Sequence, residues 1–206
     1  MLVATREILL EKLLQLPALI DAYQRNDADF VQQVNSWFQE LERALSQLRS
    51  PLASLVANQR GRIISALDGY REPALANGKM SRRKAANITT SLALSEVETA
   101  LVKLLQDIDE KFDLWREKMA QYISVASAVI PIPLPPTEPR QNWLKDIWTS
   151  WKALDETRAM YNYLNTAIAP NDRLHLLGEL LENNLNGNGH DTKPRKSRRR
   201  NSPHGK

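Results

Sequence analysis

The most distinctive side chains in this sequence are lysines and arginines near its C-terminus. Residues 190–206 carry seven of them against one aspartate, a net charge of +6. Six of the seven form a cluster: Lys193, Arg195, Lys196, Arg198, Arg199 and Arg200. Such a run can neutralise nucleic-acid phosphates and release their counterions, so it predicts binding to the backbone of RNA or DNA. Nuclear import signals, acidic-lipid sites and solubilising ends share this composition and stay open as alternatives.

A second basic segment lies in the middle of the chain. Residues 59–84 have a net charge of +5, and residues 69–78 contain the Gly, Pro and Asn-Gly signals of a turn. The helix that begins at Ser81 starts with cations, although a helix dipole favours anions there, and cations beside free N–H groups suit a bound phosphate. The residues predicted to form this cationic tip are Arg71, Lys79, Arg82, Arg83 and Lys84. The alternative is that these side chains are ordinary solvated charges.

Three tryptophans, Trp143, Trp148 and Trp151, lie within a span of nine residues. Leu144, Ile147 and Trp151 share one helix face, which predicts that Trp151 belongs to the core. Trp143 and Trp148 flank that face, and we consider them candidates for an exposed contact with a partner, where indole rings grip a protein or stack on bases. Packing in the core is the favoured alternative for both.

Two groups of side chains raise the question of a metal site. His175 lies four residues before Glu179 on one helix face, with Glu182 nearby. The other group is acidic, and paired carboxylates can hold Mg²⁺ for phosphoryl chemistry. Its members are Asp107, Asp109, Glu110 and Asp113. The acidic residues alternate with apolar positions and the histidine spacing matches no helical metal motif, so we interpret both groups as solvated surface and predict no metal.

Other enzyme classes lack the residues that they require. The chain has no cysteine, which excludes disulfides, thiolate metal sites and cysteine nucleophiles. It also has no glycine-rich phosphate loop and no nucleophile elbow. We predict a protein that is not an enzyme and uses no cofactor, with a metal-dependent enzyme built on the acidic group as a weaker alternative.

The clearest predicted helix, which must position the cationic tip, covers residues 81–128. Its apolar residues recur at intervals of three and four, the pattern of a heptad seam. They are Leu94, Val97, Leu101, Leu104, Ile108, Phe112, Trp115, Met119 and Tyr122. A helix of this length measures about 70 Å, so we expect an elongated molecule.

Two further helical segments precede it. Residues 2–23 are apolar around most of the circumference, which predicts burial on more than one side, with Pro17 as a kink or break. A second apolar stripe runs from Phe30 to Leu55. Ser50-Pro51 predicts a joint within that stripe, because proline suits the first position of a new helix.

The remaining chain divides by composition. Residues 131–140 contain five prolines and predict a stiff linker, residues 141–187 have helical periodicity, and residues 188–206 lack the apolar side chains needed to fold. We therefore predict an all-α fold. Residues 1–130 form an elongated antiparallel bundle with a coiled-coil-like long hairpin, the helices of 141–187 pack on it, and 188–206 is a disordered basic tail.

The location of the charge sharpens the functional prediction. The formal net charge is +4, yet residues 1–189 sum to −2, so the basic character lies in the tip and the tail. We predict a cytoplasmic accessory or adaptor subunit, nuclear in a eukaryote, that binds nucleic acid without reading its sequence while its helices bind a protein partner or a second copy. The alternative is a structural coiled-coil scaffold or assembly chaperone with an incidental tail. No apolar run reaches the ~20 residues that span a bilayer, so we expect no membrane partner.

Overall fold

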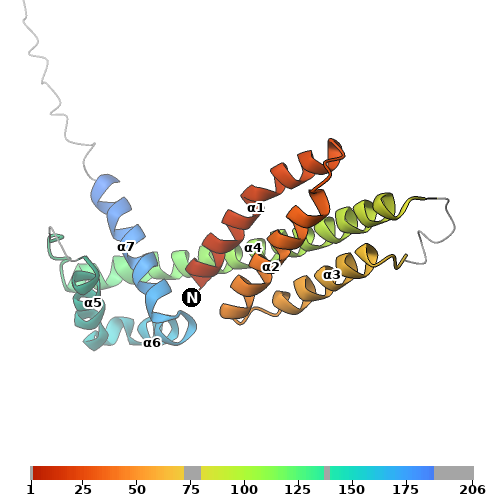
Figure 1. The fold of residues 1–206 in the computed structure, drawn as a ribbon. Helices are drawn as coiled ribbons and strands as arrows, with labels where there is room; N and C mark the ends of the chain where they lie inside the picture. The colour runs from red at the N-terminus through yellow and green to blue at the C-terminus, as the bar shows by residue number, and fades with distance from the viewer. Residues whose placement is uncertain (1, 72–79, 137–139, 188–206) are drawn as a thin grey trace, which may run out of the picture. The chain divides into compact units, whose positions relative to one another are not determined.

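The computed structural model describes residues 2–71, 80–136 and 140–187, the last four of these by backbone alone. Every regular element within these ranges is helical, which confirms the all-α prediction (Figure 1). The α-helices are α1 (Leu2–Gln24), α2 (Phe30–Gln47), α3 (Leu52–Leu67), α4 (Arg82–Val129), α5 (Arg140–Ser150), α6 (Arg158–Ala167) and α7 (Pro170–Gly187). Two short 3₁₀ helices, η2 (Trp151–Ala153) and η3 (Asp155–Thr157), connect α5 to α6.

The described chain divides into two compact units, one that ends at Leu114 and one that begins at Trp115. The division falls within α4, whereas the sequence analysis divided the chain at the proline-rich residues 131–140. The last part of α4 therefore belongs to the same unit as α5, α6 and α7.

In the first unit, α2 packs against both α1 and α3. Its buried face follows the predicted stripe, from Phe30 and Val34 through Trp37 to Leu41 and Leu45. The three- and four-residue steps keep these side chains on one face of α2. Because α2 contacts both α1 and α3, it is the central helix of the three.

Helix α3 runs antiparallel to the first part of α4 (Figure 1). Near the middle of α3, the Gln59 amide donates to a Glu96 carboxylate oxygen at 2.7 Å, and the Arg62 guanidinium donates to the same carboxylate at 3.0 Å. At the end of α3, Arg82 contacts Leu67. The pairing of later α3 residues with earlier α4 residues places the connection between the two helices at the tip.

Three helices of this unit end in the same way. A residue with positive φ follows each of them: Asn26 (55°) after α1, Arg49 (54°) after α2 and Gly69 (98°) after α3. At Gly69 its own N–H bonds to Ala66 O at 3.1 Å, and the next N–H, of Tyr70, bonds back across the turn at 2.9 Å. The same two bonds recur at Asn26 and Arg49. This is the Schellman motif, which satisfies the last carbonyls of a helix and turns the chain away.

The prediction for α1 is wrong on its outer face. Leu9 and Leu16 are buried as expected, but Leu14 is 80% exposed and Ile20 is 37% exposed. Helix α1 packs mainly against α2, and its buried residues, Leu9, Lys12, Leu16, Leu19 and Ala22, recur at the three- and four-residue spacing of one helix face. Pro17 lies inside α1 and does not end it.

Helix α4 and the C-terminal helices follow their predicted patterns closely. The seam residues of α4 are buried except for Leu104 and Trp115, which are half-buried. In the second unit, the predicted stripe is buried throughout its length: Leu144, Ile147, Trp151, Leu154, Tyr161, Leu164 and Ile168. A Cβ atom at Gly178 would lie 3.2 Å from Leu144 Cδ1, so this glycine lets α7 approach α5 closely. Among the described residues, no helix is long and apolar enough to cross a membrane.

Candidate functional site

Two arginines at the start of α4 bond to the ends of other helices. The Arg82 guanidinium donates to the carbonyl oxygen of Leu67, the last residue of α3. The Arg83 guanidinium donates to the carbonyl oxygen of Asn26, just beyond α1, at 3.3 Å. A helix C-terminus carries partial negative charge and stabilises a cation. The ends of α1 and α3 therefore favour these two cations, which the N-terminus of their own helix disfavours.

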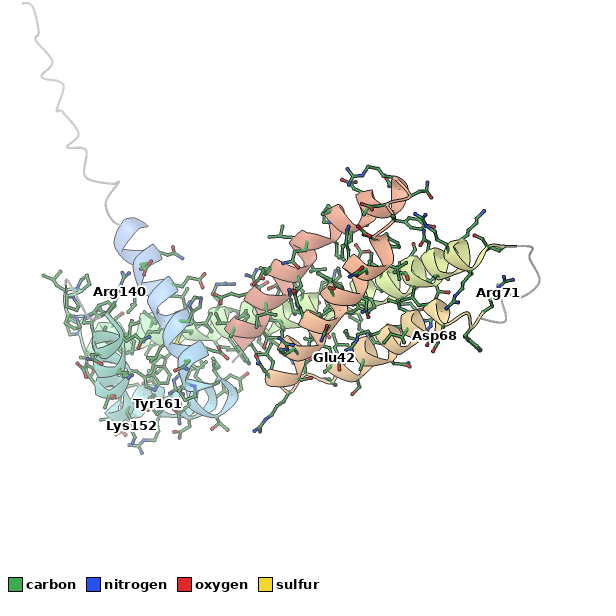
Figure 2. The ribbon with its side chains drawn as sticks, in the orientation of Figure 1. Glu42, Asp68, Arg71, Arg140, Lys152 and Tyr161 are labelled. Atoms are coloured by element: carbon green, nitrogen blue, oxygen red, sulfur yellow. The ribbon has the colours of Figure 1, made fainter. Side chains whose placement is uncertain are left out.

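Arg71 and Lys84 complete the described part of the predicted tip. Arg71 Nη2 donates to Met80 O at 2.7 Å and thereby joins the two ends of the α3–α4 connection. The Ser81 hydroxyl accepts a hydrogen bond from Lys84 N at 3.2 Å, so Ser81 caps α4. The four described basic side chains of the tip are all exposed, and Figure 2 shows Arg71 extending from the end of the first unit.

Several predicted site residues lie outside the described residues. They are Lys79, Lys193, Arg195, Lys196, Arg198, Arg199 and Arg200. Of the predicted cationic tip, the structure describes Arg71, Arg82, Arg83 and Lys84, and it brings these four residues together.

The positive charges of Arg82 and Arg83 are balanced differently from those of several arginines along the helices. Many arginines along the helices pair with carboxylates. Examples are Arg6–Asp109 (2.6 Å), Arg60–Glu42 (2.6 Å), Arg62–Glu96 (3.0 Å), Arg116–Glu179 (3.2 Å) and Arg140–Glu182 (2.5 Å). Arg82 and Arg83 instead contact carbonyl oxygens, which have no formal charge, and neither meets a carboxylate among the described residues. Within the part of the chain that the structure describes, no carboxylate pairs with either guanidinium group, so an anion from solution can do so there.

Acidic residues near the tip restrict the side from which such an anion can approach. Asp27 and Asp29 lie in the α1–α2 turn, next to the carbonyl that Arg83 contacts. Asp68 follows α3 directly. Both the α1–α2 turn and the segment directly after α3 therefore carry negative charge near the tip, and an anion is disfavoured beside either of them.

The prediction of an exposed contact at Trp143 and Trp148 is wrong, and the core packing considered as its alternative is correct. The two side chains are 8% and 5% exposed. Trp148 stacks on Tyr161 with ring centres 4.8 Å apart, and the Arg173 guanidinium lies 4.7 Å from the Trp148 ring. Trp143 Nε1 donates to Pro133 O at 3.3 Å, which fixes the proline-rich segment on α5. Helical periodicity identified the central face but not the width of the buried surface around it.

Tyr122 belongs to the same aromatic cluster. Its ring centre lies 5.3 Å from that of Trp148 and 5.7 Å from that of Trp151, and its side chain is 1% exposed. Burial raises the pKa of the Tyr122 phenol above its ordinary value, by more than the nearby Thr157 hydroxyl lowers it. Burial likewise lowers the pKa of Arg173. This cluster is the packed core of the second unit.

Three of the six carboxylates considered as metal ligands form ion pairs with arginines. Asp109 pairs with Arg6, and Glu179 and Glu182 pair with Arg116 and Arg140. Within the ranges that the structure describes, no cluster of three or more His, Asp, Glu or Cys side chains could hold a metal ion.

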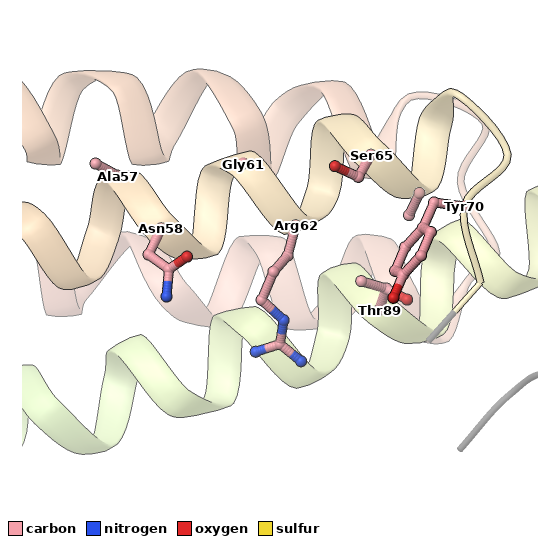
Figure 3. Close-up of a pocket in the computed structure, with 8 residues that line it drawn as sticks. Ala57, Asn58, Gly61, Arg62, Ser65, Tyr70 and Thr89 are labelled. Atoms are coloured by element: carbon pink, nitrogen blue, oxygen red, sulfur yellow. The ribbon is translucent and has the colours of Figure 1, made fainter. Parts of the chain in front are cut away.

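A groove that the sequence analysis did not identify lies between α3 and the start of α4 (Figure 3). Its volume is about 380 Å³, and it is lined by Ala57, Asn58, Gly61, Arg62, Ser65, Ala66, Tyr70 and Thr89. The signal in the sequence is the recurrence of small residues at every fourth position of α3, at Ala57, Gly61 and Ser65. Tyr70 connects this groove to the tip, because it directly precedes Arg71. No family model matches the chain, and neither a curated protein nor a solved structure is significantly similar to it.

Proposed function

We propose that this protein is a non-enzymatic accessory subunit that binds nucleic-acid backbone through its cationic tip and its basic C-terminal residues, while its helices bind protein partners. The observation that carries the proposal is the state of Arg82 and Arg83. Both are exposed, and both contact neutral carbonyl oxygens and no carboxylate among the described residues. A phosphate suits a guanidinium group, because two parallel N–H donors match two phosphate oxygens.

The carbonyl contacts also hold the two guanidinium groups in place. An arginine side chain has five N–H donors, and a single bond to Leu67 or Asn26 leaves others for a phosphate. Side chains that are already ordered lose less conformational entropy on binding. The tip is therefore a better phosphate site than the same charges on freely rotating side chains.

Contacts of this kind position a nucleic acid without reading its sequence. Hydrogen bonds to phosphates carry no base information, and the chain has no helix-turn-helix, zinc-finger or RNA-recognition signature. Residues 190–206 would add up to seven further cationic contacts. We therefore propose that binding to RNA or DNA is general and strongly dependent on salt.

A second candidate function is a coiled-coil scaffold or assembly chaperone whose basic residues are incidental. The exposed apolar residues of α1 favour a protein partner, since Leu14 is 80% exposed. This candidate predicts no nucleic-acid binding that depends on the tip, and the following experiment separates the two.

The test is an electrophoretic mobility shift with the full chain and a fluorescent RNA or DNA at 50 and 200 mM salt. The tip variant replaces three cations by glutamine, which keeps a donor for the carbonyl contacts: Arg82→Gln, Arg83→Gln and Lys84→Gln. The control variant removes equal charge from exposed positions on α2 and α4, away from the tip: Arg43→Gln, Lys103→Gln and Lys111→Gln. A third variant lacks residues 190–206.

We expect binding by the full chain at low salt, weaker binding by the tip variant and by the variant without residues 190–206, and little change in the control. Equal weakening by the tip and control variants would mean that total charge, and not the tip, sets the affinity. Absence of binding by the full chain at 50 mM salt would refute the proposal and favour the scaffold.

A further inference from the structure

We propose that the groove between α3 and α4 seats one base of a single-stranded nucleic acid whose phosphates bind the cationic tip. The inference rests on the function proposed above and specifies the form of nucleic acid that the protein prefers. It starts from the residues that line the groove, and from the way in which the groove joins the tip.

The groove has the size and the aromatic surface that a base requires. Its volume of about 380 Å³ falls within the range of sites for small organic molecules. Tyr70 lies at one end of the groove and is 61% exposed, a high value for an aromatic side chain (Figure 3). Exposed aromatic rings are stacking platforms for bases in proteins that bind single strands.

Polar groups along the groove can bond to the edge of a base. Thr89 carries a hydroxyl and lines the groove, although the residue as a whole is only 2% exposed. Asn58 and Ser65 add an amide and a second hydroxyl to the same surface. Two hydroxyl groups and one amide therefore line the space that a base would occupy, and each can donate or accept a hydrogen bond.

Gly61 leaves the groove open along α3. Glycine is unfavourable inside a helix and needs a local reason. Packing does not supply one, because a Cβ atom at Gly61 would meet nothing within 4 Å. An absent side chain lets a planar ring approach the helix backbone closely.

The distribution of charge matches a base in the groove and phosphates at the tip. The Arg62 guanidinium pairs with Glu96 at 3.0 Å, so the groove itself is close to neutral. Gly69, beside Tyr70, lies against the Arg82 side chain, since a Cβ at Gly69 would be 3.7 Å from Arg82 Nε. A neutral groove with an aromatic end thus continues directly into a cationic surface. A base in a duplex remains stacked and paired and would have to leave the helix to enter the groove.

The experiment measures binding by the full chain to a labelled 12-nucleotide RNA, as a single strand and as a duplex with its complement, by fluorescence anisotropy. Tyr70→Ala removes the stacking ring, and Tyr70→Phe retains it as the matched control. Gly61→Gln fills the groove where the structure has open space, and Gly61→Ala adds only a methyl group. Circular dichroism confirms that each variant remains helical.

We expect Tyr70→Ala and Gly61→Gln to weaken single-strand binding by roughly 5- to 150-fold, the range found when stacked aromatic residues are replaced. Duplex binding should change less than about twofold, as should single-strand binding by the two controls. If single strand and duplex both depend on Arg82 and Arg83 but neither depends on Tyr70 or Gly61, the groove inference is wrong and the proposed function stands. If neither form binds, the proposed function itself fails.

Discussion

The buried phenol of Tyr122 gives a stability prediction with a definite sign. Its side chain is 1% exposed between Trp148 and Trp151, and burial holds the pKa of the phenol above its ordinary value. In the unfolded chain the phenol has a pKa of about 10. Below that value both states keep the proton, and this residue causes no pH dependence. Above it the unfolded state loses the proton while the folded state retains it, so the free energy of unfolding falls as pH rises.

The size of the effect follows from the linkage of protonation to folding. When only the folded state retains the proton, the free energy of unfolding falls by about 1.4 kcal/mol for each pH unit above the unfolded pKa of about 10. The loss reaches about 2 kcal/mol at pH 11.5. Tyr122→Phe removes the ionisable group and keeps the ring. The difference in unfolding free energy between wild type and this variant should therefore be constant from pH 7 to 9 and shift by that amount in favour of phenylalanine at pH 11.5.

Guanidinium unfolding followed by tryptophan fluorescence measures this difference at each pH. Absorbance near 295 nm in native conditions gives an independent check, since Tyr122→Phe should remove no tyrosine ionisation below pH 11. A difference in unfolding free energy that stays flat up to pH 11.5 would refute the reasoning, because it would mean that the folded state ionises Tyr122 as readily as the unfolded chain does.

Other predictions concern backbone conformation and a buried lysine. Arg49→Gly should stabilise the protein by about 0.5–1 kcal/mol in urea unfolding, because its φ of 54° suits glycine. Gly69→Ala, at a φ of 98°, should destabilise it by about 1 kcal/mol, and a stable Gly69→Ala variant would contradict the turn geometry. Lys12 is 7% exposed and donates a hydrogen bond to Glu40 at 2.8 Å, which lowers the pKa of the Glu40 carboxyl. The contribution of this pair to stability is therefore lost as pH falls through the pKa of Glu40. Lys12→Met should raise the Glu40 pKa toward its ordinary value in an NMR titration, and an unchanged pKa would count against the pair.

The sequence predicted the helices well where one face repeats regularly. The seam from Leu94 to Tyr122 and the stripe from Leu144 to Ile168 correspond to helical faces that the structure buries, with Leu104 and Trp115 half-buried. Periodicity identifies the face that turns inward, because any packing partner covers the same spacing. It does not identify the partner or the width of the contact.

The errors follow from that limit. Trp143 and Trp148 lie beside the central face and are buried because α5 has neighbours on more than one side. Leu14 is exposed because α1 packs mainly against α2. The groove and the carbonyl contacts of Arg82 and Arg83 depend on residues distant in sequence, which no single-helix pattern can bring together.

The most direct test of the central claim is the dependence of nucleic-acid affinity on salt, compared between the full chain and the Arg82→Gln, Arg83→Gln, Lys84→Gln variant. Each phosphate contact contributes about −0.9 to the slope of log K against log salt, so losing three should make the slope shallower by roughly 2.7. Between 50 and 200 mM salt, wild type should lose roughly 40-fold more affinity than the tip variant. Parallel slopes for the two proteins would contradict the claim that these side chains bind phosphate.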